Sequence, residues 1–176
     1  MPSNESQEPK KLNSPNKVIL SSPSNKTRNE QQSSQFPSSS EDITAAIIQQ
    51  IDSLSGGFSD YPIRKLVEHA QQFGPHLKSK KLETNQIRKF LDALNQIKAK
   101  LTQIDEDEQA RFQKIETDIV LLQPKLAYAS ARQDSVTALS RVMAKAIDKV
   151  RTTDDFERLV QFLESTIAYH KAENGK

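Results

Sequence analysis

The stretch TNQIRKFLDALNQIKAKLTQI, residues 84–104, decides the fold class of this chain. Its apolar residues are spaced by threes and fours, at Ile87, Phe90, Leu91, Leu94, Ile97, Leu101 and Ile104. That spacing places them on one face of an α-helix. Thr84 is a residue type that caps helix N-termini. We therefore predict an amphipathic helix here, capped by Thr84, with its apolar face buried against other helices.

The remainder of the chain from residue 41 onward shows the same helical spacing. No segment alternates apolar β-branched or aromatic residues with polar ones, as a half-buried strand requires. Further helices are expected over about 43–54, 62–73, 112–132 with a break near Pro124, 134–150 and 154–171. The fold class is therefore all-α, a compact antiparallel bundle of about five to six helices over residues 41–176.

Local signals give the expected helix ends. Gly56 with Gly57 and Gly74 with Pro75 are expected to end the first two helices, because glycine and proline interrupt helices. Asp134 is expected to begin the helix that follows it. Asp154 and Glu157 match the capping-box spacing at the start of the last helix.

Residues 1–40 have a different composition, rich in Ser, Asn, Gln, Pro and Lys. Their apolar cluster is Val18, Ile19 and Leu20. Burying so little surface cannot offset an ordering cost of roughly 1–2 kcal/mol per residue. We predict a disordered polar tail over residues 1–40, followed by the helical domain over residues 41–176.

Composition excludes several classes of function. The chain has no cysteine, which excludes a disulfide framework, a thiolate metal site and a cysteine nucleophile. Its four glycines form no phosphate-cradling loop. An apolar run of about 18 residues, as a membrane span needs, is missing. We expect a cytoplasmic protein that binds no membrane.

Residues capable of acid–base or metal chemistry are scattered. His69, His76 and His170 show neither H-E-x-x-H nor E-x-x-H spacing. We interpret His170 as an exposed or partly packed residue near a helix end. The acidic run 105–108 fits a helix N-terminus, where it favours the helix dipole, better than a cation site. The chain is therefore predicted not to be an enzyme, with no catalytic residue, metal ligand or cofactor.

Basic residues are distributed unevenly. Residues 62–101 hold nine Lys and Arg against three acids, and residues 124–151 hold six against two. A bundle that brings these segments together would present a positive face, which attracts phosphates without reading sequence. Arg141, Lys145 and Lys149 are predicted to point outward as a ladder on one helix. A solvated face explains that ladder equally well.

Three segments in this order resemble a known family. They are LETNQIRK at 82–89, LQPKLAYASAR at 122–132, and the last helix with IAYHK at 167–171. Together they resemble the small subunit of the type III-A CRISPR effector, the Csm complex, over roughly residues 60–176. The resemblance implies a non-catalytic RNA-binding helical module in an antiviral ribonucleoprotein. It also implies that several copies lie beside the backbone subunits, which hold the guide RNA, and beside the large subunit.

The resemblance and the charge distribution together select candidate RNA contacts, made to the phosphate backbone of guide RNA and target RNA. The candidates are Arg88, Lys89, Lys125, Tyr128, Arg132, Arg141 and Lys145. Tyr128 could stack on a base, although a tyrosine flanked by alanines more often packs in a core. The alternative is a helical protein–protein interaction adaptor without nucleic-acid binding, in which the basic segments are merely solvated surface.

Overall fold

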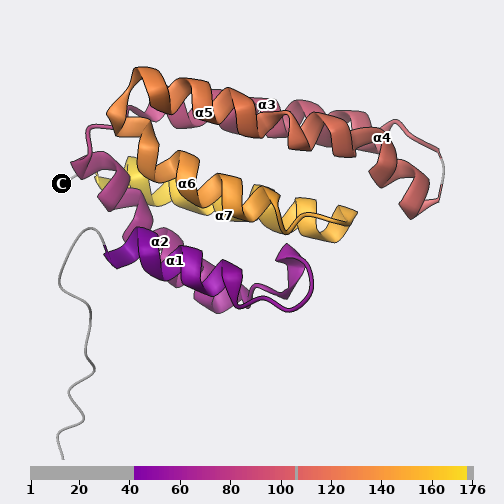
Figure 1. Cartoon of the computed structure of the whole chain (residues 1–176), viewed down its shortest axis with the longest axis horizontal. Coiled ribbons are helices and arrows are strands. Elements are labelled where there is room, and N and C mark those ends of the chain that lie inside the picture. The colour runs from indigo at the N-terminus through magenta and orange to yellow at the C-terminus, as the bar shows by residue number, and fades with distance from the viewer. Residues whose placement is uncertain (1–41, 106, 174–176) are drawn as a thin grey trace, which may run out of the picture. The chain divides into compact units, whose positions relative to one another are not determined.

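The computed structural model describes residues 42–105 and 107–173, and within these ranges the chain is helical with no strand. Its elements are α1 Asp42–Asp52, η1 Phe58–Asp60, α2 Ile63–Ser79, α3 Thr84–Thr102, α4 Glu108–Val120, α5 Leu122–Arg132, η2 Asp134–Val136, α6 Thr137–Ile147 and α7 Thr153–Ala172 (Figure 1). Only Leu121 separates α4 from α5, so the two form one interrupted rod. The all-α bundle predicted from the sequence is confirmed, whereas the tail predicted over residues 1–40 lies outside the described residues.

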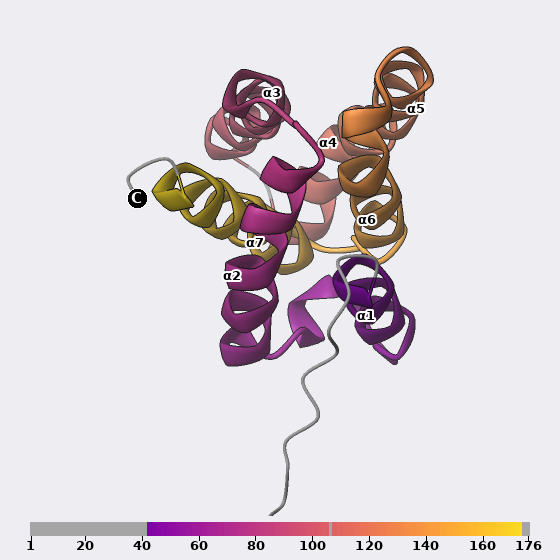
Figure 2. The same cartoon turned by 90° about the vertical axis from the view of Figure 1, so that its left-hand side faces the viewer.

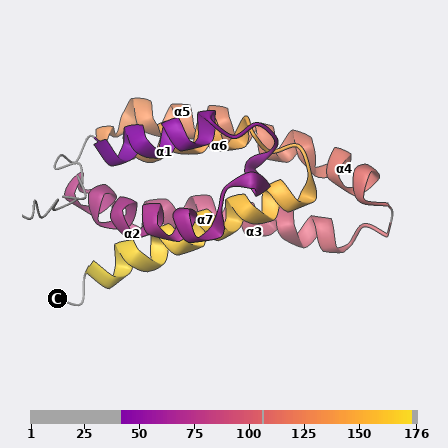
Figure 3. The same ribbon diagram turned by 90° about the horizontal axis from the view of Figure 1, so that it is seen from below.

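The helices of the bundle pack in two groups. α7 packs against α2, α3 and η1, whereas α1 and α5 both pack against α6. Seen from below, α2, α7 and α3 lie together, with α1, α5 and α6 beside them (Figure 3). Contacts of α1 with α2 and of α4 with α3, α5 and α7 join the groups.

The core contains the apolar stripe that the sequence predicted in α3. Ile87, Phe90, Leu94, Ile97 and Leu101 are all buried there. Replacing a buried residue of this stripe with a much smaller one would lower the free energy of unfolding, because helices of a bundle are held together mainly by apolar burial. α3 is therefore fixed along its length by the helices beneath it.

Gly74 does not end α2 as the sequence suggested, because α2 continues to Ser79. Its role is at the crossing of α2 and α7. A Cβ atom at this position would lie 2.5 Å from the backbone nitrogen of His170 and 2.9 Å from the carbonyl oxygen of Thr166. Glycine is needed here for close approach of two helices, which a reading of local helix breakers does not reveal.

Two predicted helix caps are shifted along the chain. The cap of α3 is Glu83, not Thr84, and Glu83 forms a capping box with Gln86. The cap of α7 is Thr152 with Asp155, not Asp154 with Glu157. Adjacent residues all had capping chemistry, so the sequence pattern allowed several registers and tertiary packing selected one.

Two other predicted helix boundaries had different outcomes. The break near Pro124 is confirmed, because α4 ends at Val120 and α5 begins at Leu122. Pro124 lies in the first turn of α5, where its missing N–H has no partner within the helix. Asp134 begins the short η2 rather than α6, which starts at Thr137.

A buried carboxylate joins η1 to the start of α7. Asp155 is almost fully buried, and it accepts hydrogen bonds from the backbone nitrogens of Ser59 at 2.7 Å and Arg151 at 2.9 Å. Burial by itself raises the pKa of Asp155, but these hydrogen bonds lower it by a larger amount, so the net pKa is below the usual value. The ionised carboxylate therefore stabilises this junction at neutral pH.

Among the described residues, no helix has the length and apolar composition needed to cross a bilayer.

Candidate nucleic-acid interface

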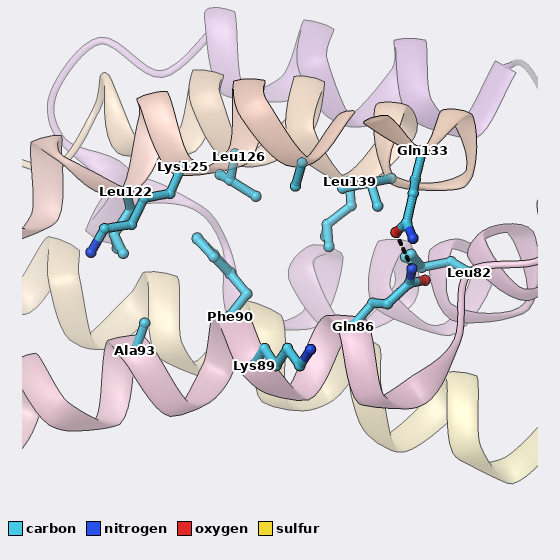
Figure 4. A pocket seen from close by; sticks show the side chains of 12 residues that line it. Leu82, Gln86, Lys89, Phe90, Ala93, Leu122, Lys125, Leu126, Gln133 and Leu139 are labelled. Atoms are coloured by element: carbon cyan, nitrogen blue, oxygen red, sulfur yellow. Dashed lines mark hydrogen bonds between the residues drawn. The ribbon is translucent and has the colours of Figure 1, made fainter. Parts of the chain in front are cut away.

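A groove opens between α3 and α5. α3 packs on α7 and α4, whereas α5 packs on α6, and the two helices stand apart in the end view (Figure 2). The space between them is a cavity of about 330 Å³. It is lined by Leu82, Gln86, Lys89, Phe90, Ala93, Leu122, Lys125, Leu126, Ala129, Gln133, Val136 and Leu139 (Figure 4). We call this cavity the α3–α5 groove.

The walls of the α3–α5 groove are apolar and well anchored. Leu82, Phe90, Leu122, Leu126 and Leu139 are all buried members of the hydrophobic core. They line the groove from α3, α5 and α6 and from the turn before α3. The groove is thus a gap in the packing between helices rather than a loop-lined depression.

Two glutamine side chains close one end of the groove. The amide nitrogen of Gln86 donates a hydrogen bond to the side-chain oxygen of Gln133 (Figure 4). The side-chain oxygen of Gln86 accepts from the backbone nitrogen of Glu83 at 3.0 Å, within the capping box of α3. The pair therefore ties α3 to the turn that follows α5, and helix capping fixes its position.

The charge around the groove has one sign. Lys89 on α3 and Lys125 on α5 are exposed, and both line the groove. The twelve lining residues include no aspartate and no glutamate. An anionic ligand would therefore meet attraction from both walls.

Tyr128 and Arg132 form a pair on the outer face of α5. The guanidinium carbon of Arg132 lies 5.6 Å from the centroid of the Tyr128 ring, and Nη1 donates a hydrogen bond to the tyrosine hydroxyl at 3.2 Å. Tyr128 is 65% exposed, so it does not pack in the core, which is the commoner fate of a tyrosine flanked by alanines. α5 buries only Leu122 and Leu126, which leaves this face to solvent. Tyrosine holds the arginine in one orientation through a cation–π contact.

The seven predicted RNA contacts fall into two groups in the structure. One group lies on α3 and α5, where Lys89 and Lys125 line the groove. Arg88, Tyr128 and Arg132 are exposed on the same two helices but do not line it. α6 carries the other two, Arg141 and Lys145, and neither lines the groove.

The α6 residues have different surroundings from the groove. Arg141 lines a separate hollow with Thr44, His76 and Lys80. Lys145 forms an ion pair with Asp52 of α1, with its Nζ 3.0 Å from Oδ1. The predicted outward ladder holds for Arg141 and Lys145 but not for Lys149, which is partly buried and donates to the carbonyl oxygen of Leu54 at 2.7 Å.

Some residues near the groove were missed by sequence reasoning. Lys80 and Lys81 lie in the turn between α2 and α3, next to Leu82 of the groove. The run KSKK at 78–81 was a signal for them. Gln86 and Gln133 carried no signal, because they are 47 residues apart and only the fold brings their amides together.

The histidines serve the fold. His170 is 2% exposed, so the prediction of an exposed or partly packed residue is wrong. Its Nε2 donates to the carbonyl oxygen of Leu82 at 2.8 Å, which fixes the end of α7 beneath the turn before α3. This contact joins two of the three segments that carry the family resemblance. Within the described ranges, no group of three or more His, Asp or Glu side chains is placed to hold a metal ion.

The comparisons with known proteins gave one match. A family model described as Csm2 Type III-A matches residues 60–176, which is more than half of the chain. No curated protein and no solved structure matches. The matched region contains α3, α5 and α7, and hence the whole α3–α5 groove.

Proposed function

Because the chain belongs to the Csm2 Type III-A family, the small subunits of the type III-A CRISPR effector, we propose that it is a non-catalytic RNA-binding subunit of that ribonucleoprotein. It lines the path of guide RNA and target RNA through contacts to the phosphate backbone. It also supports filament assembly, with neighbouring copies of itself and with the backbone and large subunits. Its place of action is the cytoplasm.

One observation carries the RNA-binding proposal. Four basic side chains are exposed on the two helices that flank the groove. They are Arg88 and Lys89 on α3, and Lys125 and Arg132 on α5. The fold thus places Lys89 and Lys125, which come from separate segments of the sequence, on the two sides of that groove. Basic side chains on two parallel walls can follow a phosphate backbone, and such contacts bind RNA without reading its sequence.

The remaining predicted contacts take secondary places in this proposal. Arg141 and Lys80 line a second hollow, which Asp134 also lines. Lys145 already pairs with Asp52, so its charge is partly offset. We expect the residues beside the α3–α5 groove to contribute most of the salt-dependent binding.

The non-catalytic role has its own support in the described residues. His69 lies 2.5 Å from the hydroxyl of Tyr61, and His170 bonds to the carbonyl of Leu82. Both imidazoles are therefore engaged inside the bundle, and neither lines the groove. General acid–base work needs a titrating group within reach of a bound substrate, and the groove is lined by amides, ammonium groups and apolar side chains.

The experiment that tests this function measures target-RNA affinity of the assembled effector with Arg88→Ala and Arg132→Ala combined. Affinity is measured at two salt concentrations with two unrelated guide and target pairs. We expect a similar loss on both pairs, and a salt slope shallower by about 2, since each phosphate contact contributes about 1. Arg64→Ala combined with Lys171→Ala is the matched control, because it removes two exposed charges from α2 and α7 and none from α3 or α5.

The same experiment decides between this function and a protein adaptor without nucleic-acid binding. If the double variant assembles and binds both targets with unchanged affinity and slope, these arginines are not phosphate contacts. The basic segments would then be solvated surface or subunit interface.

A further inference from the structure

The α3–α5 groove has features that phosphate contacts alone do not use. A positively charged surface is sufficient for phosphate binding. Here the basic residues instead border a cavity of about 330 Å³ with apolar walls that include the ring of Phe90. Such a size, with mostly apolar lining and a few convergent polar groups, is typical of a pocket for a small organic group.

We propose that the α3–α5 groove binds one unpaired base of an RNA strand. The amide pair of Gln86 and Gln133 faces the edge of the base, and Lys89 and Lys125 hold the phosphates on either side of it. This inference rests on the proposed function and adds a site for the base to it.

The chemistry of a nucleotide matches the groove in three parts. The faces of a base are apolar and pack against apolar or aromatic side chains, here Phe90 and the leucines of the walls. Its edge carries hydrogen-bond donors and acceptors, which glutamine amides pair with. Its flanking phosphates are anionic, and the groove is lined by lysines from both helices and by no acid.

The amide pair retains the capacity for further hydrogen bonds. The nitrogen of Gln86 uses one N–H for the bond to Gln133. The nitrogen of Gln133 carries two N–H donors that this bond does not require. A base edge can accept from these donors while it lies in the groove.

A protein side chain is the competing occupant. An apolar side chain would fill the groove but would cover the amides without giving them a partner, which costs free energy. An acidic peptide would pair with the lysines but would leave the apolar walls of the groove uncovered. A nucleotide is the ligand class that engages walls, amides and lysines together.

The test fills the groove without changing its charge. Ala129 lies on α5 and lines the groove, whereas Ala127 lies on the exposed face of the same helix. Ala129→Phe therefore occupies the space of the base, and Ala127→Phe is the matched control. Thermal unfolding verifies that both variants of the full chain are folded.

Binding is measured with two probes of equal length and charge, a single-stranded oligouridine and an abasic ribose-phosphate oligomer. The unmodified protein is expected to bind oligouridine about tenfold more tightly than the abasic oligomer, within the range for burying one base against apolar side chains. Ala129→Phe is expected to lose that difference, whereas Ala127→Phe is expected to keep it. A Gln86→Ala, Gln133→Ala variant tests the amides separately and is expected to lose part of the preference.

Each other outcome overturns the inference in a distinguishable way. If Ala129→Phe binds both probes as the unmodified protein does, the groove does not hold a base and the phosphate-binding function stands. If Ala129→Phe keeps its RNA binding but no longer co-purifies with the other effector subunits, the groove holds a protein side chain. If no variant, including the unmodified chain, binds either probe in a salt-dependent way, the proposed function fails together with this inference.

Discussion

At the scale of single residues, the turn between α2 and α3 places Lys81 in an uncommon backbone conformation. Its φ angle is 63°, in the left-handed region. Lys81 donates its backbone N–H to the carbonyl of Lys78 at 2.8 Å, and Leu82 donates to Leu77 at 3.0 Å. Helices that end in this pattern usually have glycine at the left-handed position. A lysine is retained beside the groove at a conformational cost.

We predict that Lys81→Gly stabilises the protein. The left-handed conformation costs an L-residue roughly 1–2 kcal/mol, which glycine does not incur, although glycine gives the unfolded chain more freedom. The net gain is expected to be about 1 kcal/mol, visible as a rise of a few degrees in Tm. Lys80→Gly is the control, because Lys80 has an ordinary φ of −79° and loses the same charge. Equal effects of the two substitutions would contradict this account of the turn.

A second residue-scale feature is the contact of His69 with Tyr61. Burial raises the pKa of Tyr61 above its usual range, as does the charge of Glu68. The hydroxyl therefore stays protonated and donates to Nδ1 of His69, 2.5 Å away, which requires a neutral ring. Burial lowers the pKa of His69, Lys65 lowers it further, and Glu68 partly opposes them. The folded protein thus binds this proton less readily than the unfolded chain.

This difference predicts a pH dependence of stability. Because the folded pKa is the lower one, the contribution of His69 is fully present above its unfolded pKa of about 6.5, and it is lost as the pH falls toward the folded pKa. Tm is expected to fall between about pH 7.5 and 5.5. The fall should be smaller in His69→Gln, whose amide can accept from Tyr61 without titrating. An identical fall in both proteins would show that His69 does not titrate in this range.

At the scale of elements, the sequence predicted the existence of helices better than their ends. The three-and-four spacing in α3 is set by the core itself, so Ile87 and Leu94 are buried as expected. Caps at Glu83 and Thr152 were missed by one or two residues, because neighbouring residues offered the same hydrogen bonds. Gly74 was misread as a stop, since its role depends on α7, about 90 residues away.

The close approach of α2 and α7 gives a prediction for Gly74→Ala. The added Cβ would meet backbone atoms of α7, which cannot rotate away, so the two helices must separate. We expect a loss of about 1–3 kcal/mol or more in the free energy of unfolding, measured with urea. Gly56→Ala is the control, because the atoms in its way belong to the exposed side chain of Asp60. A loss no larger than that of the control would mean that α2 and α7 can shift at little cost.

At the scale of the whole molecule, the sequence predicted a positive face but not its form. The basic segments 62–101 and 124–151 indicated that α3 and α5 could share a surface, and both flank the groove. The groove itself depends on α3 resting on α7 while α5 rests on α6. No spacing within one helix encodes that separation. The fold also pairs Lys145 with Asp52 of α1, and this ion pair could not be predicted from the sequence either.

The central claim is that RNA lies along α3 and α5, and ultraviolet cross-linking of the assembled effector followed by mass spectrometry tests it most directly. We predict RNA-linked peptides from residues 82–93 and 122–133, with Tyr128 as a preferred site because its ring is exposed beside Arg132. Signals from these peptides should fall when Arg88→Ala and Arg132→Ala are combined, while subunit composition stays the same. RNA links confined to α1, or to the surface of α2 around Arg64, in a fully assembled effector would contradict the account.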